Sequence, residues 1–345
     1  MSSVVVAPTP TRAQVRRRSA LSTRVYLPAL AVAAVAAILI AVGWAMEWGH
    51  SDFGGSASSH WVVVAGPATL AIIGVFLVVE RLWPAQQRAL VTRGHRQDLL
   101  YTVLNATVLV PLLTGLALAF TAVVRDAAPW IVLPRIGALP RWGAILALVV
   151  LFDACNWMVH LAVHRVLPLW RFHELHHSQE DLSVLTVFRT HPLLHVPYLV
   201  NLIPGVVLLA NGGMSITILV AYTAFVAFAH SNTRLGFGPL ERVFVSPNYH
   251  RIHHLLDGPQ DVNLGFVLTI WDQIFGRAVF PTAATVRADT GLPGRPLVVE
   301  HEAPRARHLS VFAAQLVAPF RPMHELTDRP PVRSKTTDGN EVPTW

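Results

Sequence analysis

Histidine spacing is the feature of this sequence that points most directly to chemistry. The chain of 345 residues contains 17 histidines, and 11 of them fall between His160 and His254. Eight of these follow the spacings i, i+4 or i, i+3, i+4: the pair His160 and His164, the triplet His173, His176 and His177, and the triplet His250, His253 and His254. On a helix these spacings place the side chains on one face. Three such faces can converge on a shared centre.

The number of histidines indicates how many metal ions that centre holds. Imidazole suits Fe, Zn, Cu and Ni, and a structural zinc site needs about four ligands. Eight to ten histidines are too many for one ion but suit two ions with four or five nitrogens each. We therefore predict a di-metal site and add His191 and His230, which lie between the triplets, to its ligands. His195 lies there too. It is either a further ligand or a residue that caps the apolar segment that follows.

Four polar residues near the histidines are expected to orient them. A metal-bound imidazole donates its second ring N–H to a carboxylate, carbonyl or water, and such partners fix the ring. The candidates are Asp153, Asn232, Asn263 and Asp272. Asp153 stands inside an apolar run, where a carboxylate is costly to bury. We interpret it as a partner of a metal-bound histidine, and the alternative is that it pairs with a nearby arginine.

Two other classes of metal protein are compatible with a histidine cluster. A metal transporter would place its ligands in the middle of the membrane and carry acidic residues within several spans, whereas these histidines follow the ends of apolar runs. A zinc-dependent hydrolase would need only three protein ligands and a water, which leaves most of the histidines without a role. Metal content distinguishes the classes, because a hydrolase of this kind would carry one zinc per chain, whereas the predicted di-metal site would carry two ions.

Composition determines which kind of element positions these residues. Apolar residues make up 53 % of the chain and charged residues 14 %, whereas soluble domains carry about 25 % charged residues. The formal net charge is +7, and nearly all of the positively charged residues are arginines, which lie at the ends of apolar runs. That placement is typical of membrane topology and argues against a nucleic-acid partner. The single cysteine, Cys155, excludes a disulfide within the chain.

Several apolar runs are long enough to cross a membrane, which takes roughly 20 residues. The runs are 25–46, 61–79, 99–124, 142–163 and 196–229. The last is interrupted by Pro204-Gly205 and by Asn211-Gly212-Gly213, so we predict a helical hairpin that enters and returns on one side. Arginines before the first run and between the second and third place both segments in the cytosol. The expected fold is an all-α polytopic membrane bundle with a histidine-rich di-metal site at its cytosolic face.

The domain organisation follows from these runs. We predict a disordered basic N-terminus at 1–24, N-terminal transmembrane helices at 25–140, the histidine-bearing domain at 141–281, and a partly disordered cytosolic tail at 282–345. Within the tail, the segment from Leu309 to Phe320 is apolar but too short to cross a membrane. It is expected to lie at the interface or to pack on the cytosolic part of the protein.

The order of the histidine motifs resembles that of the fatty acid hydroxylase/sterol desaturase family of membrane di-iron enzymes. That family combines H-x-x-x-H, H-x-x-H-H, R-x-H-P, H-S-N and P-x-x-H-x-x-H-H. The matching residues are His160 to His164, His173 to His177, Arg189-Thr190-His191-Pro192, His230-Ser231-Asn232, and Pro247 to His254. Trp157, Leu161 and Leu194 depart from residues common in the family. None of these departures removes an expected ligand, but they leave the subgroup, and hence the substrate, open.

The resemblance implies a function for the predicted domain. Members of this family bind two iron ions and use O2 as co-substrate to hydroxylate or desaturate C–H bonds of lipids. The substrate here is then a sterol, a fatty acyl chain, a carotenoid or an ether lipid. The alcohol and the alkene are both open as products, and the choice of lipid stays open as well.

An external electron donor is implied as well. The chain has one cysteine and no motif for flavin, haem or an iron–sulfur cluster, so a ferredoxin or a cytochrome with its reductase must supply electrons. Arg165, Arg171 and Arg189 lie among the histidines and could bind an acidic carrier. Contact of the same arginines with lipid headgroups is the alternative.

Overall fold

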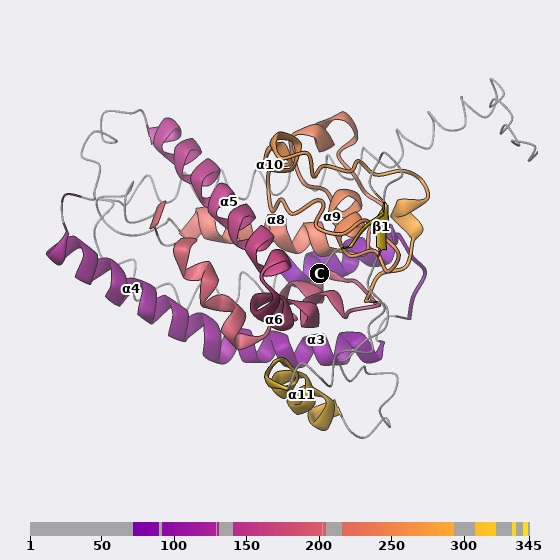
Figure 1. Cartoon of the computed structure of the whole chain (residues 1–345), viewed down its shortest axis with the longest axis horizontal. Helices are drawn as coiled ribbons and strands as arrows, with labels where there is room; N and C mark the ends of the chain where they lie inside the picture. Colours follow the sequence, from indigo (N-terminus) through magenta and orange to yellow (C-terminus); the bar gives the residue numbers. More distant parts are fainter. Residues whose placement is uncertain are drawn as a thin grey trace, which may run out of the picture.

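The computed structural model describes residues 72–89, 92–128, 130, 141–201, 203–204, 216–292, 308–321, 333–335 and 341–343. The predicted run at 25–46 lies outside the described residues, as do most of 61–79 and part of 196–229. The described part is helical apart from a two-stranded antiparallel sheet that pairs β1 (Arg333–Lys335) with β2 (Glu341–Pro343). The all-α expectation is therefore met by the part that holds the histidines (Figure 1).

The described helices form a bundle around the end of α5. They are residues 72–82, α3 (Arg93–Leu104), the π-helix η1 (Asn105–Leu109), α4 (Val110–Ala127), α5 (Arg141–Arg165), α6 (Leu167–His177), α8 (Ile216–His230), α9 (Pro247–His253), α10 (Ile270–Ile274) and α11 (His308–Val317). Short 3-10 turns connect them: η4 (Val184–Phe188), η5 (Pro192–His195), η6 (Pro197–Asn201), η7 (Gly238–Arg242), η8 (Thr285–Arg287) and η9 (Ala318–Phe320). In Figure 1, α5 runs from the edge of the molecule to its centre, where it meets α6.

Among the described residues, one helix is long and apolar enough to cross a membrane. This stretch is Leu146–Arg165, the main part of α5, and it covers most of the predicted span at 142–163. Residues of the predicted span at 99–124 are helical, in α3, η1 and α4. One such helix does not establish a polytopic bundle, so the multi-pass topology remains a prediction.

An apolar core joins the helix at 72–82 to η4 and α8. Ile73, Phe76 and Val79 pack there against Val184 and Phe228, and the rings of Phe76 and Phe228 lie 5.4 Å apart. The spacing of three and four residues along 72–82 places its apolar side chains on one face. This packing fixes the end of α8, which carries His230.

The C-terminal helix α11 lies beside α3 (Figure 1). The Tyr101 hydroxyl donates to Gln315 Oε1 at 3.1 Å, and the ring of Tyr101 contacts that of Phe312 at 4.7 Å. Gln97 Nε2 donates to the carbonyl of His308 at 2.8 Å. The apolar segment predicted at 309–320 therefore packs on the helical body through one face, while Leu309 and Val317 stay exposed.

Candidate metal centre

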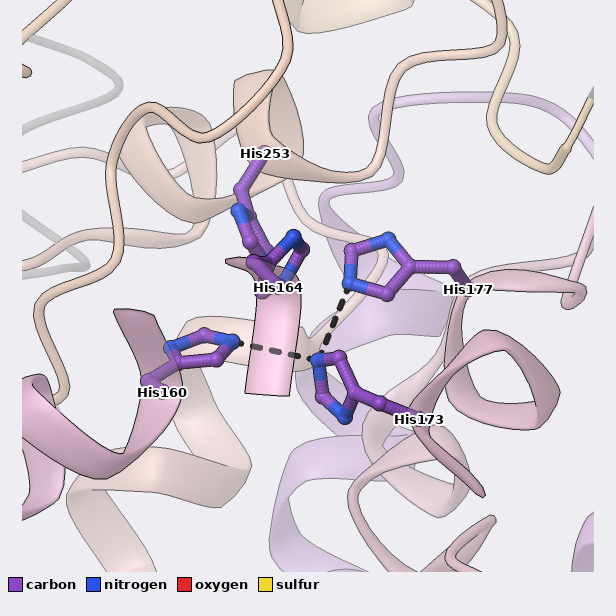
Figure 2. Close-up of side chains that lie close together, drawn as sticks. All are labelled: His160, His164, His173, His177 and His253. Atoms are coloured by element: carbon purple, nitrogen blue, oxygen red, sulfur yellow. Dashed lines mark hydrogen bonds between the residues drawn. The ribbon is translucent and has the colours of Figure 1, made fainter. Parts of the chain in front are cut away.

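Nine histidines of the described chain gather into two adjacent groups. In each group the ligand atoms all lie within 4.8 Å of one another. The five-histidine group contains His160, His164, His173, His177 and His253. The four-histidine group contains His176, His230, His250 and His254. The rings of the five-histidine group point toward one another from α5, α6 and the end of α9 (Figure 2).

The close approach of Nε2 atoms indicates that the histidines of each group face a common point. His173 Nε2 lies 3.2 Å from the Nε2 atoms of both His160 and His177. In the four-histidine group, three successive Nε2 pairs lie 3.1, 3.1 and 3.2 Å apart: His176–His230, His230–His250 and His250–His254. An ion about 2.0–2.1 Å from each nitrogen would separate neighbouring ligands by roughly 2.9–3.4 Å at ordinary coordination angles. The observed spacings match that range.

Two short helical segments serve both groups at once. On α6, His173 and His177 point to the five-histidine group and His176 to the four-histidine group. At α9, His253 joins the first group, whereas His250 and His254 join the second. Residues separated by four share a helix face, while the residue between them is rotated away. Each i, i+3, i+4 triplet thus lets a single turn of helix supply ligands to both groups.

The chemical state of the rings fits metal binding. The six site histidines on α6 and at α9 are buried, and burial together with neighbouring histidines lowers the pKa of each well below the ordinary 6.5. Such imidazoles are neutral and offer a lone pair. Two buried nitrogens, Nε2 of His164 and Nε2 of His253, have no hydrogen-bond partner within the described structure. An ion would satisfy both, and an all-nitrogen set suits Fe, Zn, Cu or Ni.

Backbone carbonyls orient three of the rings. His160 Nδ1 lies 2.8 Å from the carbonyl of Leu264, and His253 Nδ1 lies 2.9 Å from that of Val262. His230 Nδ1 lies 2.8 Å from the carbonyl of Val226, one helical turn earlier. A carbonyl can only accept, so each Nδ1 carries the proton and Nε2 is left to face the centre.

A carboxylate that the sequence analysis missed lies beside His164. Asp261 Oδ1 is 3.5 Å from His164 Nδ1, and the same carboxylate pairs with Arg165. Asp261 adopts φ +53°, a left-handed conformation that Asp tolerates better than most residues. Its position in the loop after the last histidine triplet is the only sequence feature that could have suggested it.

Asp272 was expected to orient a histidine, and the structure places its carboxylate on the backbone segment that contacts His160. Its Oδ1 accepts from Trp157 Nε1 at 2.8 Å and from Leu264 N at 3.0 Å. Its Oδ2 accepts from the Tyr249 hydroxyl at 3.0 Å. Because the carbonyl of Leu264 holds His160, the carboxylate fixes the ring indirectly.

The other three predicted partners also hold backbone segments. Asp153 accepts from Val267 N, Leu268 N and Trp271 Nε1 at 2.9–3.1 Å, so its partners are N–H groups and not a histidine or an arginine. Asn263, at φ +54°, bonds Tyr249 O and both backbone groups of Val279. Asn232 Oδ1 accepts from Arg251 Nη2 at 2.8 Å and from Gln86 N at 3.2 Å. Among the described contacts, none of the four bonds a histidine of either group.

His191 and His195 lie outside both groups. His191 Nε2 is 3.0 Å from the carbonyl of Leu316, and its Nδ1 accepts from Leu193 N at 3.2 Å. His195 Nε2 is 3.1 Å from Asn105 Oδ1. The proline after His191 starts a 3-10 turn, and the histidine caps that turn with its own ring. This local role explains why a histidine of the R-T-H-P motif points away from the centre.

The three arginines considered for carrier docking make internal contacts. Arg189 is completely buried and bonds Asp98 Oδ1 at 3.1 Å. Arg171 donates to the carbonyls of Ala318 and Arg321, and Arg165 pairs with Asp261. Arg189 therefore cannot face a carrier, whereas Arg171 contacts the tail and Arg165 keeps 55 % of its side chain exposed beside its ion pair.

Comparison with known proteins adds to this geometry. Residues 145–277 match the family model described as fatty acid hydroxylase. The chain is 28 % identical over 271 residues to ornithine lipid hydroxylase OlsE of Rhizobium tropici, covering 75 % of this chain and 76 % of that protein. It is 30 % identical over 132 residues to alkylglycerol monooxygenase of Homo sapiens and 28 % identical over 147 residues to that of Danio rerio.

The coverage differs between these relatives. The human and zebrafish matches take in 36 % and 42 % of this chain but only 28 % and 31 % of those proteins. This chain thus spans less than a third of the length of these two alkylglycerol monooxygenases. No solved structure matches the chain. The resemblance inferred from the histidine motifs is confirmed by the family match, which lies within the predicted domain at 141–281.

Proposed function

We propose, from the match of residues 145–277 to the fatty acid hydroxylase family model, that the protein is an O2-dependent, non-haem di-iron enzyme that hydroxylates a C–H bond of a lipid. The observation that carries the proposal is the convergence of nine histidines into two adjacent all-nitrogen groups. Iron bound there supplies the oxidising power that an unactivated C–H bond requires and that no side chain provides. Ornithine lipid and alkylglycerol, named in the relatives, are the first substrates to supply.

The proposed ligands are the nine grouped histidines and not His191. The five-histidine group holds one iron and the four-histidine group the other, with neutral Nε2 donors. The chain keeps these nitrogens in place through the carbonyls of Leu264 and Val262. Asp272 and Asp261 act as positioning residues, the first through Leu264 and the second beside His164. Asp153, Asn263 and Asn232 position the segments that carry the ligands.

The reaction requires an electron donor and protons. One hydroxylation consumes the C–H bond, one O2, two electrons and two protons, and it gives the alcohol and one water. The single cysteine and the lack of a cofactor motif support an external donor, which we propose is a ferredoxin or a cytochrome with its reductase. We also propose that the protein is an integral membrane protein with its histidines at the cytosolic face. The apolar α5, which ends at the histidines, supports that placement.

Metal content and oxygen dependence test the proposal together. Full-length protein purified in lipid nanodiscs should contain two irons per chain. With a reductase, a carrier and alkylglycerol or ornithine lipid, it should form a hydroxylated product that carries one oxygen atom from 18O2. Omitting either the carrier or O2 should stop product formation. One zinc per chain, or lipid turnover that continues without O2, would instead support a hydrolase.

A further inference from the structure

One face of α5 continues past the metal ligands as a line of four side chains. Phe152, Asn156, His160 and His164 follow one another at i, i+4 spacing, so they lie on the same side of the helix. His160 and His164 belong to the five-histidine group. Asn156 lies four residues, or about 6 Å along the axis at a rise of about 1.5 Å per residue, from His160. Asn156 is therefore the residue of this line next to the five-histidine group, and Phe152 lies one further turn along.

Aromatic rings pack beside His160 and Phe152 of this line. The ring of Phe266 lies 5.1 Å from that of His160, and it also approaches Tyr198 at 6.2 Å and Tyr222 at 6.4 Å. Phe152 meets the edge of Tyr222 at 4.8 Å. The ring of Phe266 thus lies near both His160 and Tyr222. The surroundings are apolar, which suits a hydrocarbon chain.

Two polar atoms in this apolar layer have no partner within the described part of the chain. The hydroxyl of Tyr222 and Oδ1 of Asn201 are both inaccessible to solvent and make no hydrogen bond there. Asn201 Nδ2 donates to Asn156 Oδ1 at 2.8 Å, and Asn156 Nδ2 donates to the carbonyl of Phe152 at 2.8 Å. This chain of bonds fixes the amide of Asn201 with its oxygen free. A buried polar atom left unpaired is destabilising, so each such atom in a native protein needs an explanation.

We propose that Tyr222 and Asn201 bind a neutral polar group of the lipid substrate, a hydroxyl or a carboxamide. This inference rests on the proposed function and names the substrate class of the same site. The phenol donates a hydrogen bond and the amide oxygen accepts one, so the ligand group must offer both an acceptor and a donor. The polar group then lies beside Phe266, whose ring contacts that of His160 at 5.1 Å, and the enzyme oxidises a carbon near that group.

The charges around this site exclude anionic headgroups. The ring and hydrogen-bond contacts of Tyr222 and Asn201 include Phe152, Phe266 and Asn156, which are all neutral, and the Asp153 carboxylate acts electrostatically on Tyr222. The ionisable residue next to this line on α5 is Asp153, whose carboxylate is held by backbone and indole N–H groups. Phosphate and carboxylate recognition relies on cationic side chains such as Arg. Among the described residues, a carboxylate ligand would meet no cationic side chain here, and Asp153 would repel it.

Equilibrium binding tests the site without requiring turnover. The probes are hexadecanol, hexadecanamide, hexadecanoate and hexadecane, presented to the iron-loaded full-length protein in nanodiscs. Wild-type protein should bind the alcohol and the amide about tenfold more tightly than the alkane, the ratio expected from one or two neutral hydrogen bonds. Hexadecanoate should gain no such advantage over the alkane.

Isosteric variants complete the test. Tyr222→Phe removes only the hydroxyl, and Asn201→Leu removes the amide, so each should lower the alcohol-to-alkane preference about threefold or more by removing one of the two hydrogen bonds. Tyr101→Phe is the matched control because the Tyr101 hydroxyl already bonds Gln315 on α3 and α11, and it should keep the full preference.

The outcomes separate this site from the proposed function. A wild-type preference near one, as expected if water alone satisfies the two atoms, would overturn the assignment, and so would an undiminished preference in Tyr222→Phe. A lowered preference in both site variants supports it. Because binding is read without O2 or electrons, failure of the oxygenase reaction would show separately in the product assay.

Discussion

The carboxylate of Asp98 and the guanidinium of Arg189 form an ion pair at 3.1 Å, and neither side chain is exposed to solvent. Arg189 Nε also donates to the carbonyl of Leu175 at 3.0 Å, in the last turn of α6. A cation at this end of a helix is favourable because the free carbonyls carry partial negative charge. The pair therefore ties α3, which precedes the family domain, to the turn that supplies His176 and His177.

Removing the charge of Asp98 should destabilise the protein strongly. Asp98→Asn leaves the buried guanidinium of Arg189 without its counter-ion, which costs about 3–5 kcal/mol in comparable sites. We expect a marked fall in the thermal unfolding temperature in nanodiscs. Asp126→Asn makes the same change at an exposed position of α4 and should unfold like the wild type. Equal unfolding temperatures for the two variants would contradict the role given to the pair.

Loss of a grouped histidine should remove iron. His177→Ala takes a ligand from the five-histidine group, and His176→Ala takes one from the four-histidine group. Each variant should retain at most one iron per chain, measured by mass spectrometry of the purified protein. His191→Ala should keep both irons because its ring contacts Leu193 and Leu316 instead. Iron loss in His191→Ala equal to that in His176→Ala would refute the ligand set.

Weakening the support of His160 should lower iron affinity without removing a ligand. Asp272→Asn keeps the shape of the side chain but replaces one oxygen by a donor, so it cannot accept all its present bonds from Trp157, Tyr249 and Leu264. Loss of such supporting contacts costs about 10–100-fold in metal affinity. In competition with a chelator, the variant should lose the iron of the five-histidine group at a lower chelator concentration than the wild type. Unchanged chelator resistance would mean that Leu264 is held without Asp272.

Glu80 should make stability depend on pH. Burial raises its pKa from 4.5 to about 7, although N–H groups of Asn232 and Val184, and the charges of Arg251 and Arg88, oppose the shift. The folded protein then holds a proton that the unfolded chain releases above about pH 4.5. The contribution of Glu80 to stability is highest below that pH, decreases as the pH rises toward 7, and stays low above it, a change on the order of 3 kcal/mol.

A neutral variant isolates this effect. Glu80→Gln keeps an oxygen that can accept from Val184 N and Asn232 N, as Oε1 does now at 2.6 and 2.8 Å. The unfolding temperature of Glu80→Gln minus that of the wild type should therefore increase from pH 5 to pH 8. A difference that stays constant, or decreases, across this range would show that the carboxyl ionises at its ordinary pKa.

Local spacing predicted the residues that gather, because the position of a side chain on a helix depends only on its neighbours in sequence. The pair on α5 and the two triplets required nothing more. His191 was misplaced because the proline after it starts a 3-10 turn, in which the ring caps the backbone. A motif shared with a family indicates that a residue matters, but it does not say which way the side chain points.

Supporting contacts were much harder to predict, because they join residues far apart in the chain. Asp98 meets Arg189 across 91 positions, and Trp157 meets Asp272 across 115. No local pattern marks such partners. The free oxygen of Asn201 likewise depends on a bond from its own amide to Asn156, 45 positions away. These contacts exist only once the helices have packed, so they become visible only in the structure.

The way one turn of α6 feeds both groups has a consequence for how the ions load. The first ion to bind would order His173 and His177, and with them the backbone that presents His176 to the other group. At α9, an ion bound to His253 would in the same way order its neighbour His254, which belongs to the four-histidine group. The second ion then binds ligands whose conformational freedom has already been lost, so it binds more tightly than the first. Iron uptake should accordingly be cooperative, and partly loaded preparations should contain mostly chains with two ions or none.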